Sequence, residues 1–481
     1  MSGCESFYWY DYETFGADPR RDRPAQFGGV RTDTGLNPIA APLVLYCKPA
    51  PDFLPSPDAC LITGITPQEA LRKGVPEAQF IAAIHDEFSV PGTCVAGYNN
   101  IRFDDEITRH CLYRNLIDPY GREWRNGNSR WDLIDMLRLA RALRPEGIVW
   151  PKDETGRPSM KLEFLTAANG IAHADAHDAL SDVYATIAMA RLLRERQPRL
   201  VQFLFEHRCK QKAAELLALG SFQPVVHASE KFSAEKHCIA VVVALAQDPR
   251  SPNGVVAYDL SVDPTPLLTL DADTLRERLY TPAANLPEGV ARLPLKTVHL
   301  NKCPVLAPVK ALRPEDIERL NLDLPRCDEH LECLKADALS VAGKIREILS
   351  AEPPASEEPD PDLMLYDGGF LGDGDSATLD RLRGLEPRQL AEARPQFRDP
   401  RLPEMLFRYR ARNYRETLSA EEAARWEAFR LRRITVPGCG AGLARSEYEA
   451  RLDQLEAAPE TKPGQREIIA SLRDYLREIA P

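Results

Sequence analysis

The sequence lacks the features of a membrane-spanning or disulfide-stabilised protein. No apolar run in its 481 residues is long enough to cross a bilayer. The first residues contain neither a basic segment nor an apolar one, so we expect no secretory signal. The 11 cysteines are odd in number, and none forms a CxxC pair. We therefore expect reduced thiols, no structural zinc site and a cytoplasmic location.

The sequence also lacks an excess of basic residues. It contains 61 Lys and Arg against 72 Asp and Glu, a net charge of −11, which argues mildly against a nucleic-acid-binding protein. The sum does not exclude local basic patches, and a site that holds cations with carboxylates would itself add acid. At roughly 150 residues per domain, the length predicts about three domains.

Local composition divides the chain into three domains and one linker. Residues 1–197 mix strand and helix patterns, whereas residues 198–350 contain alternating β-branched runs and few helices. Residues 351–362 form an acidic, proline-rich linker, and residues 363–481 have helical periodicity almost throughout. We predict an α/β fold in which the linker ties the helical domain back against the first domain.

Several elements have clear boundaries. An aromatic strand at residues 7–10 precedes strands at 25–32 and 43–47, and their short links predict an antiparallel meander. Thr66 and Pro67 mark a helix start. Further strands are predicted at 93–97, 239–246, 255–260 and 298–306. The longer predicted helices span 76–88, 102–116, 162–169, 178–197, 404–418, 420–433, 445–457 and 464–479.

Two acids stand at the end of the first strand. Asp11 and Glu13 are two residues apart, so both carboxylates point to one face of the strand. Carboxylates that close repel one another unless a cation neutralises them, and Mg²⁺ takes carboxylate oxygens as ligands. A pair of surface acids would look the same, so this motif is weak by itself.

Other candidate residues stand at two helix starts. Asp104 is expected to face inward, whereas Asp105 and Glu106 are expected to face solvent. His177 comes just before a helix and Asp182 about one turn inside it, so both side chains can reach the same cavity. A first-turn carboxylate can also do no more than complement the helix dipole.

The combination is far more specific than its parts. Acids on a first strand, an acid after a later strand, and a histidine and an acid around a helix start form the arrangement of the DEDD exonucleases, in the subtype with histidine. Four carboxylates suit two divalent ions on a phosphodiester, and a histidine suits a base that activates water. The candidate residues are Asp11, Glu13, Asp104, His177 and Asp182.

Longer segments resemble bacterial exonuclease I across nearly the whole chain. They include YDYETFG at residues 10–16 and further matches at 23–27, 61–68, 97–106, 128–132, 176–186, 273–280, 301–306, 366–368 and 409–413. The resemblance implies a ribonuclease H-like exonuclease domain, an SH3-like β domain and a C-terminal helical domain that clamp single-stranded DNA. It also implies a monomer that degrades DNA from the 3′ end to 5′-mononucleotides in repair and recombination.

The resemblance also assigns roles to individual residues. Asp11, Glu13, Asp104 and Asp182 would hold two Mg²⁺ ions, with Mn²⁺ as a possible substitute. Asp11 would bridge both ions and His177 would be the general base. Lys161 matches a basic residue that touches substrate phosphate, although a surface lysine would look the same. The other expected substrate contacts are Glu13, Arg109, Arg408 and Arg412.

Residues 406–415 combine arginine with aromatic side chains, as single-strand-binding grooves do. At helical spacing Arg408 and Arg412 share one face, and we expect that face to contact phosphate. The family also docks the acidic C-terminal tail of single-stranded DNA-binding protein. By resemblance Arg144 and Arg313 would bind that tail, although each is otherwise an ordinary loop residue before a proline.

Two alternatives remain open. The chain could be an RNA-trimming or proofreading DEDD exonuclease, although such enzymes need little beyond the first domain. It could also be a non-catalytic adaptor that binds single-stranded DNA through a decayed site, although its set of acids and histidine is complete.

Overall fold

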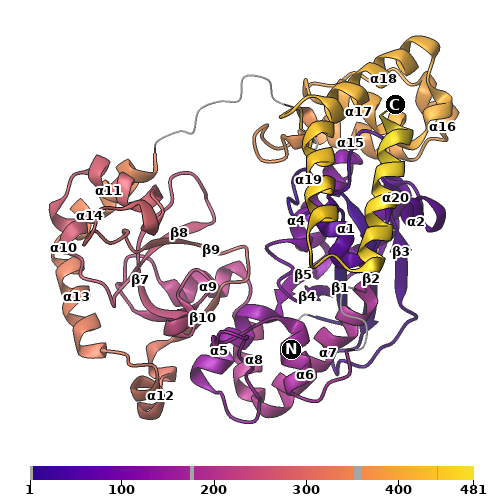
Figure 1. The fold of residues 1–481 in the computed structure, drawn as a ribbon. Coiled ribbons are helices and arrows are strands. Elements are labelled where there is room, and N and C mark those ends of the chain that lie inside the picture. Colours follow the sequence, from indigo (N-terminus) through magenta and orange to yellow (C-terminus); the bar gives the residue numbers. More distant parts are fainter. Residues whose placement is uncertain (1–3, 174–177, 351–359, 441, 481) are drawn as a thin grey trace. The chain divides into compact units, whose positions relative to one another are not determined.

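The computed structural model describes residues 4–173, 178–350, 360–440 and 442–480 (Figure 1). The chain forms two compact units. Unit 1 contains residues 131–172 and 188–355, and unit 2 contains residues 3–130, 173–187 and 356–481. Residues 351–359 of the predicted linker lie outside the described residues. No helix in the described ranges is long and apolar enough to span a membrane.

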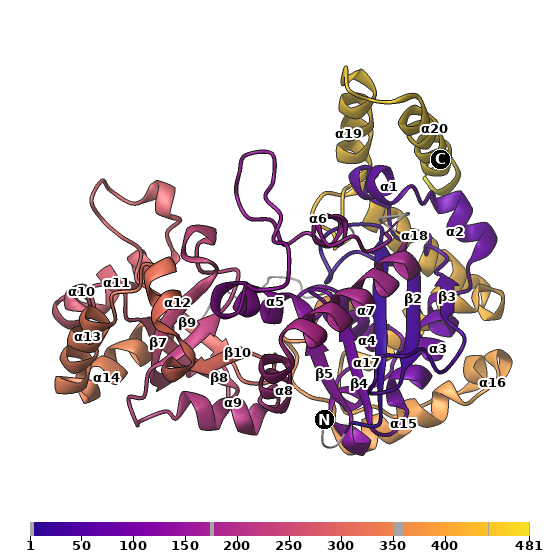
Figure 2. The ribbon, with the colours of Figure 1, turned by 90° about the horizontal axis from the view of Figure 1, so that it is seen from below.

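A mixed five-stranded sheet underlies the predicted first domain, in the order β3-β2-β1-β4-β5 (Figure 2). β1 pairs antiparallel with β2, and β2 with β3, which confirms the predicted meander. β4 runs parallel to β1 on its other side. The strands are β1 (Ser6–Thr14), β2 (Pro24–Thr32), β3 (Leu43–Tyr46), β4 (Thr93–Gly97) and β5 (Ser129–Asp132).

In the predicted first domain, the helices that begin at Pro67, Glu77, Asp104, Leu162 and Ala179 start close to the predicted positions, whereas those at 57–63 and 133–143 were not predicted. Thr66 caps the helix that starts at Pro67 and accepts a hydrogen bond from the Glu69 backbone N–H, as the sequence indicated. The helices are α1 (Pro57–Thr63), α2 (Pro67–Lys73), α3 (Glu77–Ser89), α4 (Asp104–Arg114), α5 (Leu133–Leu143), α6 (Leu162–Ala168) and α7 (Ala179–Arg196).

Strand β1 alternates between two environments. Tyr8, Tyr10 and Tyr12 are buried against α3 and α4 in one core, together with Phe27 of β2 and Phe88 of α3. Successive side chains of a strand point to opposite faces, so Asp11 and Glu13 face away from this core. The aromatic strand therefore presents its two acids on the face opposite α3 and α4.

The C-terminal helices of unit 2 share a core with the N-terminal part of the chain. Tyr448 and Leu472 are fully buried in one cluster with Phe15 and Cys60. Figure 1 shows α19 and α20 on either side of α1, which contacts both. The helices are α15 (Asp373–Arg383), α16 (Pro387–Glu392), α17 (Leu402–Asn413), α18 (Ala420–Thr435), α19 (Arg445–Ala457) and α20 (Pro463–Ile479).

Unit 1 is built on an antiparallel sheet of order β10-β6-β7-β8-β9. The predicted strand at 298–306 is in fact the end of β9 and the start of β10, separated by a turn. The strands are β6 (Val225–Ala228), β7 (Ile239–Gln247), β8 (Gly254–Asp259), β9 (Leu295–His299) and β10 (Val305–Pro308).

Unit 1 also contains more helix than the sequence predicted. Leu334 of α13 and Ile345 of α14 are fully buried against β7 and β8 residues such as Val243 and Val256. The helices after α7 are α8 (Pro198–Glu206), α9 (Lys210–Leu217), α10 (Thr265–Thr269), α11 (Ala272–Tyr280), α12 (Pro314–Arg319), α13 (Leu324–Ala336) and α14 (Ala338–Leu349).

Candidate active site

The start of α7 reaches the acids of β1 because β2 has a glycine between them. Gly28 lies directly opposite Asp11 in the β1–β2 register. A Cβ atom on Gly28 would lie 2.6 Å from the backbone carbon of Ala179 and the backbone nitrogen of Leu180. Only a residue without a side chain allows this approach, so Gly28 sets the distance between the first turn of α7 and β1.

Gln26 fastens the same helix start. It lies opposite Glu13 in the register and is 2% exposed. Its side-chain amide donates to Asp178 Oδ2 at 3.0 Å, and its Oε1 accepts from the Ala179 backbone N–H at 3.3 Å. Asp178 in turn accepts from the Ser181 backbone N–H at 3.1 Å, which makes it the predicted cap. Sequence reasoning assigned no role to Gln26, whose one signal is an amide between the apolar residues Ala25 and Phe27 of β2.

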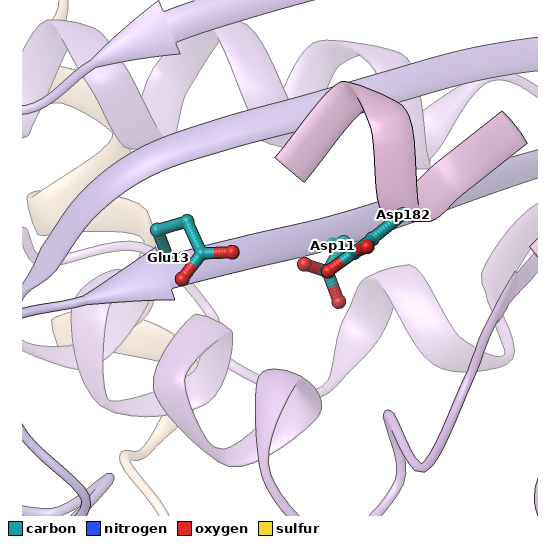
Figure 3. Close-up of side chains that lie close together, drawn as sticks. All are labelled: Asp11, Glu13 and Asp182. Atoms are coloured by element: carbon teal, nitrogen blue, oxygen red, sulfur yellow. The ribbon is translucent and has the colours of Figure 1, made fainter. Parts of the chain in front are cut away.

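These contacts bring three of the predicted carboxylates together (Figure 3). Ligand oxygens of Asp11, Glu13 and Asp182 all lie within 4.8 Å of one another. The strand pairing is irregular between Glu13 and Thr14, at the end of β1 where the site lies, as is common beside active sites. A cluster made only of carboxylate oxygens fits a hard divalent cation such as Mg²⁺.

The electrostatics of the cluster favour a cation. Burial, followed by repulsion from Asp104, Glu13 and Asp182, raises the pKa of Asp11 well above its usual value. Burial and then Asp182 and Asp104 raise the pKa of Glu13 to about 9. Asp104 therefore acts on both β1 acids, although it is not one of the three residues whose oxygens converge. Each carboxylate in such a cluster gains if a positive charge is present.

Two tyrosines fix β1 to the helix that begins at Asp104. Tyr10 donates from its hydroxyl to Asp105 Oδ1 at 2.8 Å. Thr108 donates to the Tyr12 hydroxyl at 3.1 Å. Because Tyr10 and Tyr12 flank Asp11 on the strand, these two bonds hold the acid-bearing segment of β1 against α4.

The prediction that Asp105 and Glu106 face solvent is wrong. Asp105 is fully buried, and its two oxygens accept from Arg122 and Arg130 at 2.7 Å each. Glu106 is 9% exposed and pairs with Arg109 at 2.9 Å. Arg122 and Arg130, from other parts of the chain, neutralise Asp105, and spacing along α4 carries no information about such partners. Glu106 is paired with an arginine one turn further along the same helix.

The structure describes one histidine beside the carboxylates, and it is a residue that sequence reasoning missed. His173 Nε2 is hydrogen-bonded to Asp182 Oδ1, and its side chain is 5% exposed. The contact orients one of the three clustered carboxylates. The predicted general base, His177, lies outside the described residues.

Of the other predicted substrate contacts, Arg109 is buried and Lys161 is exposed. Arg109 is 3% exposed and binds Glu123 through bonds of 2.7 and 2.9 Å, in addition to Glu106. Lys161, in unit 1, precedes α6 and lies 3.6 Å from Glu163 with its side chain 69% exposed. Its substrate contact stays a prediction.

The expected exposed basic face of α17 does not exist. Arg408 is buried and the side chain of Arg412 is only 6% exposed. Arg412 binds Asp52 at 2.8 Å and Asp362 at 2.5 Å. Arg408 binds Asp360 and Asp362. Asp360 and Asp362 come from the end of the predicted linker, so these arginines fasten that segment to α17 instead of facing solvent.

The two predicted partner-binding arginines meet at one acid of unit 1. Arg144 lies 3.2 Å from Asp316 Oδ2, and Arg313 lies 2.8 Å from the same atom. Asp316 is fully buried, whereas the side chains of Arg144 and Arg313 are 29% and 30% exposed. Both guanidinium groups are therefore partly accessible to solvent beside α12.

Three known families match successive parts of the chain. Residues 8–190 match a family described as Exonuclease, residues 208–351 the Exonuclease I SH3-like domain, and residues 359–479 the Exonuclease I C-terminal domain. Exodeoxyribonuclease I of Escherichia coli (strain K12) is 47% identical over 477 residues, which are 98% of each chain. The three predicted domain types are thereby confirmed.

Solved structures of similar proteins have the same fold. A moderately thermophilic exonuclease I from Methylocaldum szegediense has a TM-score of 0.95 and 65% identity, covering 99% of this chain and 100% of that one. Escherichia coli exonuclease I in complex with a dA16 oligonucleotide has a TM-score of 0.95 and 46% identity, and its complex with dT13 has 0.94 and 46%. Each covers 99% of this chain and 100% of the other.

Proposed function

This chain belongs to the exonuclease I family, and on that premise we propose that it hydrolyses single-stranded DNA from the 3′ end and releases 5′-mononucleotides. The observation that carries the proposal is the convergence of Asp11, Glu13 and Asp182 within 4.8 Å. One relative, exonuclease I of Escherichia coli, was crystallised in complex with dA16 and with dT13 oligonucleotides. Degradation of such strands would serve DNA repair and recombination.

Asp11, Glu13, Asp104 and Asp182 would hold two divalent ions, Mg²⁺ or Mn²⁺. When bound, such ions stabilise the charge on the attacking and leaving oxygens of a phosphodiester. The chain itself supplies a partly buried set of oxygen ligands, and burial together with mutual repulsion raises the pKa values of Asp11 and Glu13. Asp11 would be the ligand that contacts both ions, as the family resemblance implies.

His177 is the proposed general base, which would accept a proton from the attacking water. It is adjacent in sequence to Asp178, the cap of α7 that Gln26 holds. His173 would keep Asp182 oriented through its contact with Oδ1. Lys161 is proposed to contact substrate phosphate. Arg109, Arg408 and Arg412 are not part of the proposed substrate site, because carboxylates already occupy their buried guanidinium groups.

We further propose that Arg144 and Arg313 bind the acidic tail of a single-stranded DNA-binding protein. The partly open guanidinium groups around Asp316 support this proposal, since an acidic peptide could use their remaining donors. Arg313 also pairs with Glu146 at 2.8 Å and with Glu315 at 3.2 Å, and both acids are more than half exposed. An incoming carboxylate could replace either one.

The proposed reaction is tested with oligonucleotides labelled at either end. Purified protein is incubated with single-stranded DNA, duplex DNA and RNA, with Mg²⁺ or with a chelator. We expect loss of single-stranded DNA only with Mg²⁺, and mononucleotide release from the 3′ label before the 5′ label. Preferential loss of RNA would support the RNA-trimming alternative, and absence of cleavage would support the non-catalytic adaptor.

A further inference from the structure

Unit 2 exposes aromatic side chains that the carboxylate cluster does not explain. Phe370 is 87% exposed and Tyr366 is 54% exposed, both in the segment before α15. Large apolar side chains left in water mark a surface that binds something when several of them gather. Phe370 packs edge to face against Tyr120, with ring centroids 5.6 Å apart. We call Tyr120, Tyr366 and Phe370 the aromatic platform.

Buried polar groups hold the platform in place. Arg109 donates to the Tyr366 hydroxyl at 3.1 Å, and its guanidinium lies 5.5 Å from the centre of the Tyr120 ring. The Tyr366 hydroxyl donates in turn to Glu106. Because Glu123 also binds Arg109 through two bonds, the group between the two tyrosines is fixed from several sides. The two tyrosine rings therefore form a preorganised surface, and Phe370 packs against one of them.

The platform is attached to the helix that carries a candidate metal ligand. Arg109 and Glu106 both belong to α4, which begins at Asp104. The Tyr366 ring also meets His110 of α4 edge to face at 5.8 Å. The platform is thus anchored to α4, the helix whose first residue is the candidate metal ligand Asp104.

The charges around the platform favour a neutral ring as its ligand. Arg109 is already bound to Glu106 and Glu123. Arg20, which meets the same segment, is paired with Asp367 at 2.6 Å. A phosphate would have to displace a carboxylate from either arginine, whereas the flat face of a base can stack on exposed aromatic rings without doing so.

We propose that Tyr120, Tyr366 and Phe370 form a base-stacking subsite for single-stranded DNA. The inference rests on the proposed function, since DNA is the ligand it names. Stacking does not depend on which base is present, because every base has a π-face. A subsite of this kind would accept strands as different as the dA16 and dT13 crystallised with a relative of this chain.

The test compares Phe370→Ala with the wild type in binding dT13 and a strand of the same length with abasic sites. Full-length protein is used with a chelator, so that no cleavage occurs, at several salt concentrations. We expect the variant to bind dT13 about 5- to 100-fold more weakly. The abasic strand should bind both proteins equally, and the slope of log affinity against log salt should be unchanged, because no phosphate contact is lost.

Two further variants serve as controls. Phe370→Trp keeps an aromatic face and should retain wild-type affinity. Ile62→Ala removes another exposed apolar side chain of unit 2, 62% exposed on α1, and should not change binding. Equal affinity of Phe370→Ala and wild type for dT13 would overturn the subsite, as would an equal loss with the abasic strand. A wild-type protein that binds neither strand would instead overturn the proposed function, and the subsite with it.

Discussion

Gly28 of β2 faces Asp11 of β1 across the sheet, and the backbone of the first turn of α7 occupies the space of its absent side chain. The packing of the α7 backbone against Gly28 therefore affects the position of a candidate metal ligand. Asp182 belongs to that first turn, so its distance from Asp11 depends on how closely α7 can approach β2. A glycine, which no catalytic motif would single out, is therefore part of the site.

Gly28→Ala should impair catalysis more than it impairs folding. The new methyl group would meet backbone atoms at 2.6 Å, so α7 must shift, and a displacement of about 1 Å can cost roughly 10²-fold in rate. Overpacking of this kind costs about 1–3 kcal/mol in the free energy of unfolding. Rate and thermal midpoint are measured together. Gly343→Ala, at an open position of α14, is the control and should leave the rate unchanged.

Mg²⁺ should stabilise the protein more at high pH than at low pH. Without metal, burial and the neighbouring acids raise the pKa of Glu13 to about 9, whereas an unfolded chain releases this proton near pH 4.3. The folded state therefore binds more protons between these values, and its stability falls as the pH rises through that window. A cation that binds Glu13 in place of the proton removes this loss of stability.

Thermal unfolding with Mg²⁺ or a chelator, at several pH values from 5 to 9, checks this prediction. The rise in the midpoint caused by Mg²⁺ should grow with pH, and titration calorimetry in two buffers should detect proton release. Glu13→Gln should flatten the dependence. A Mg²⁺ effect that is the same at all pH values in the wild type would show that the cation does not bind these carboxylates.

The buried arginines of α17 should matter for stability and not for DNA affinity. Removing Arg412 would leave the buried carboxylates of Asp52 and Asp362 with fewer cations, and breaking a buried pair in this way costs about 3–5 kcal/mol. Arg412→Met should therefore lower the free energy of unfolding in a denaturant titration. Arg415→Met, at an exposed position 3.3 Å from Glu427, should change it little. If Arg412→Met instead left stability unchanged and weakened DNA binding, the phosphate contact expected from the sequence would be supported.

The same cluster predicts acid lability. Burial alone would raise the pKa of Asp52, but Arg412, Arg433 and Arg23 lower it below its usual range. Asp362 is likewise held well below its usual pKa against the effect of burial, by Arg412, Arg408 and Arg433. Stabilisation from such groups is complete above the unfolded pKa near 3.9 and is lost as the pH falls below it. We expect the free energy of unfolding to drop steeply below about pH 4, and no change between pH 5 and pH 3 would contradict the cluster.

The sequence predicted those parts of the fold that depend on neighbours in the chain. The cap at Thr66, strand 93–97 and helix 445–457 have the predicted positions, because capping, short apolar runs and helical periodicity are local signals. Asp11 and Glu13 could be paired for the same reason, since a strand repeats every two residues. The convergence of Asp182 on this pair came from the family resemblance.

The parts that could not be predicted depend on contacts between distant segments. Asp105 was predicted to be exposed because its spacing on the helix does not reveal Arg122 and Arg130. These arginines reach it from other elements and allow it to be buried. Arg412 looked exposed for the same reason, since its partner Asp52 is 360 residues away. Burial of a charged side chain requires a partner, and spacing along one helix does not reveal a partner on another.

The turnover of Asp11→Asn tests the central claim that Asp11, Glu13 and Asp182 hold the cations that hydrolysis requires. Degradation of 5′-labelled single-stranded DNA is measured with Mg²⁺, and affinity for the same strand is measured with a chelator. We predict a rate at least roughly 10²–10³-fold below wild type, unchanged DNA affinity and a metal-free thermal midpoint that is equal or higher, because one repelling charge is gone. A variant that binds DNA and degrades it within about tenfold of the wild-type rate, a barrier difference of less than ~1.4 kcal/mol, would contradict the account.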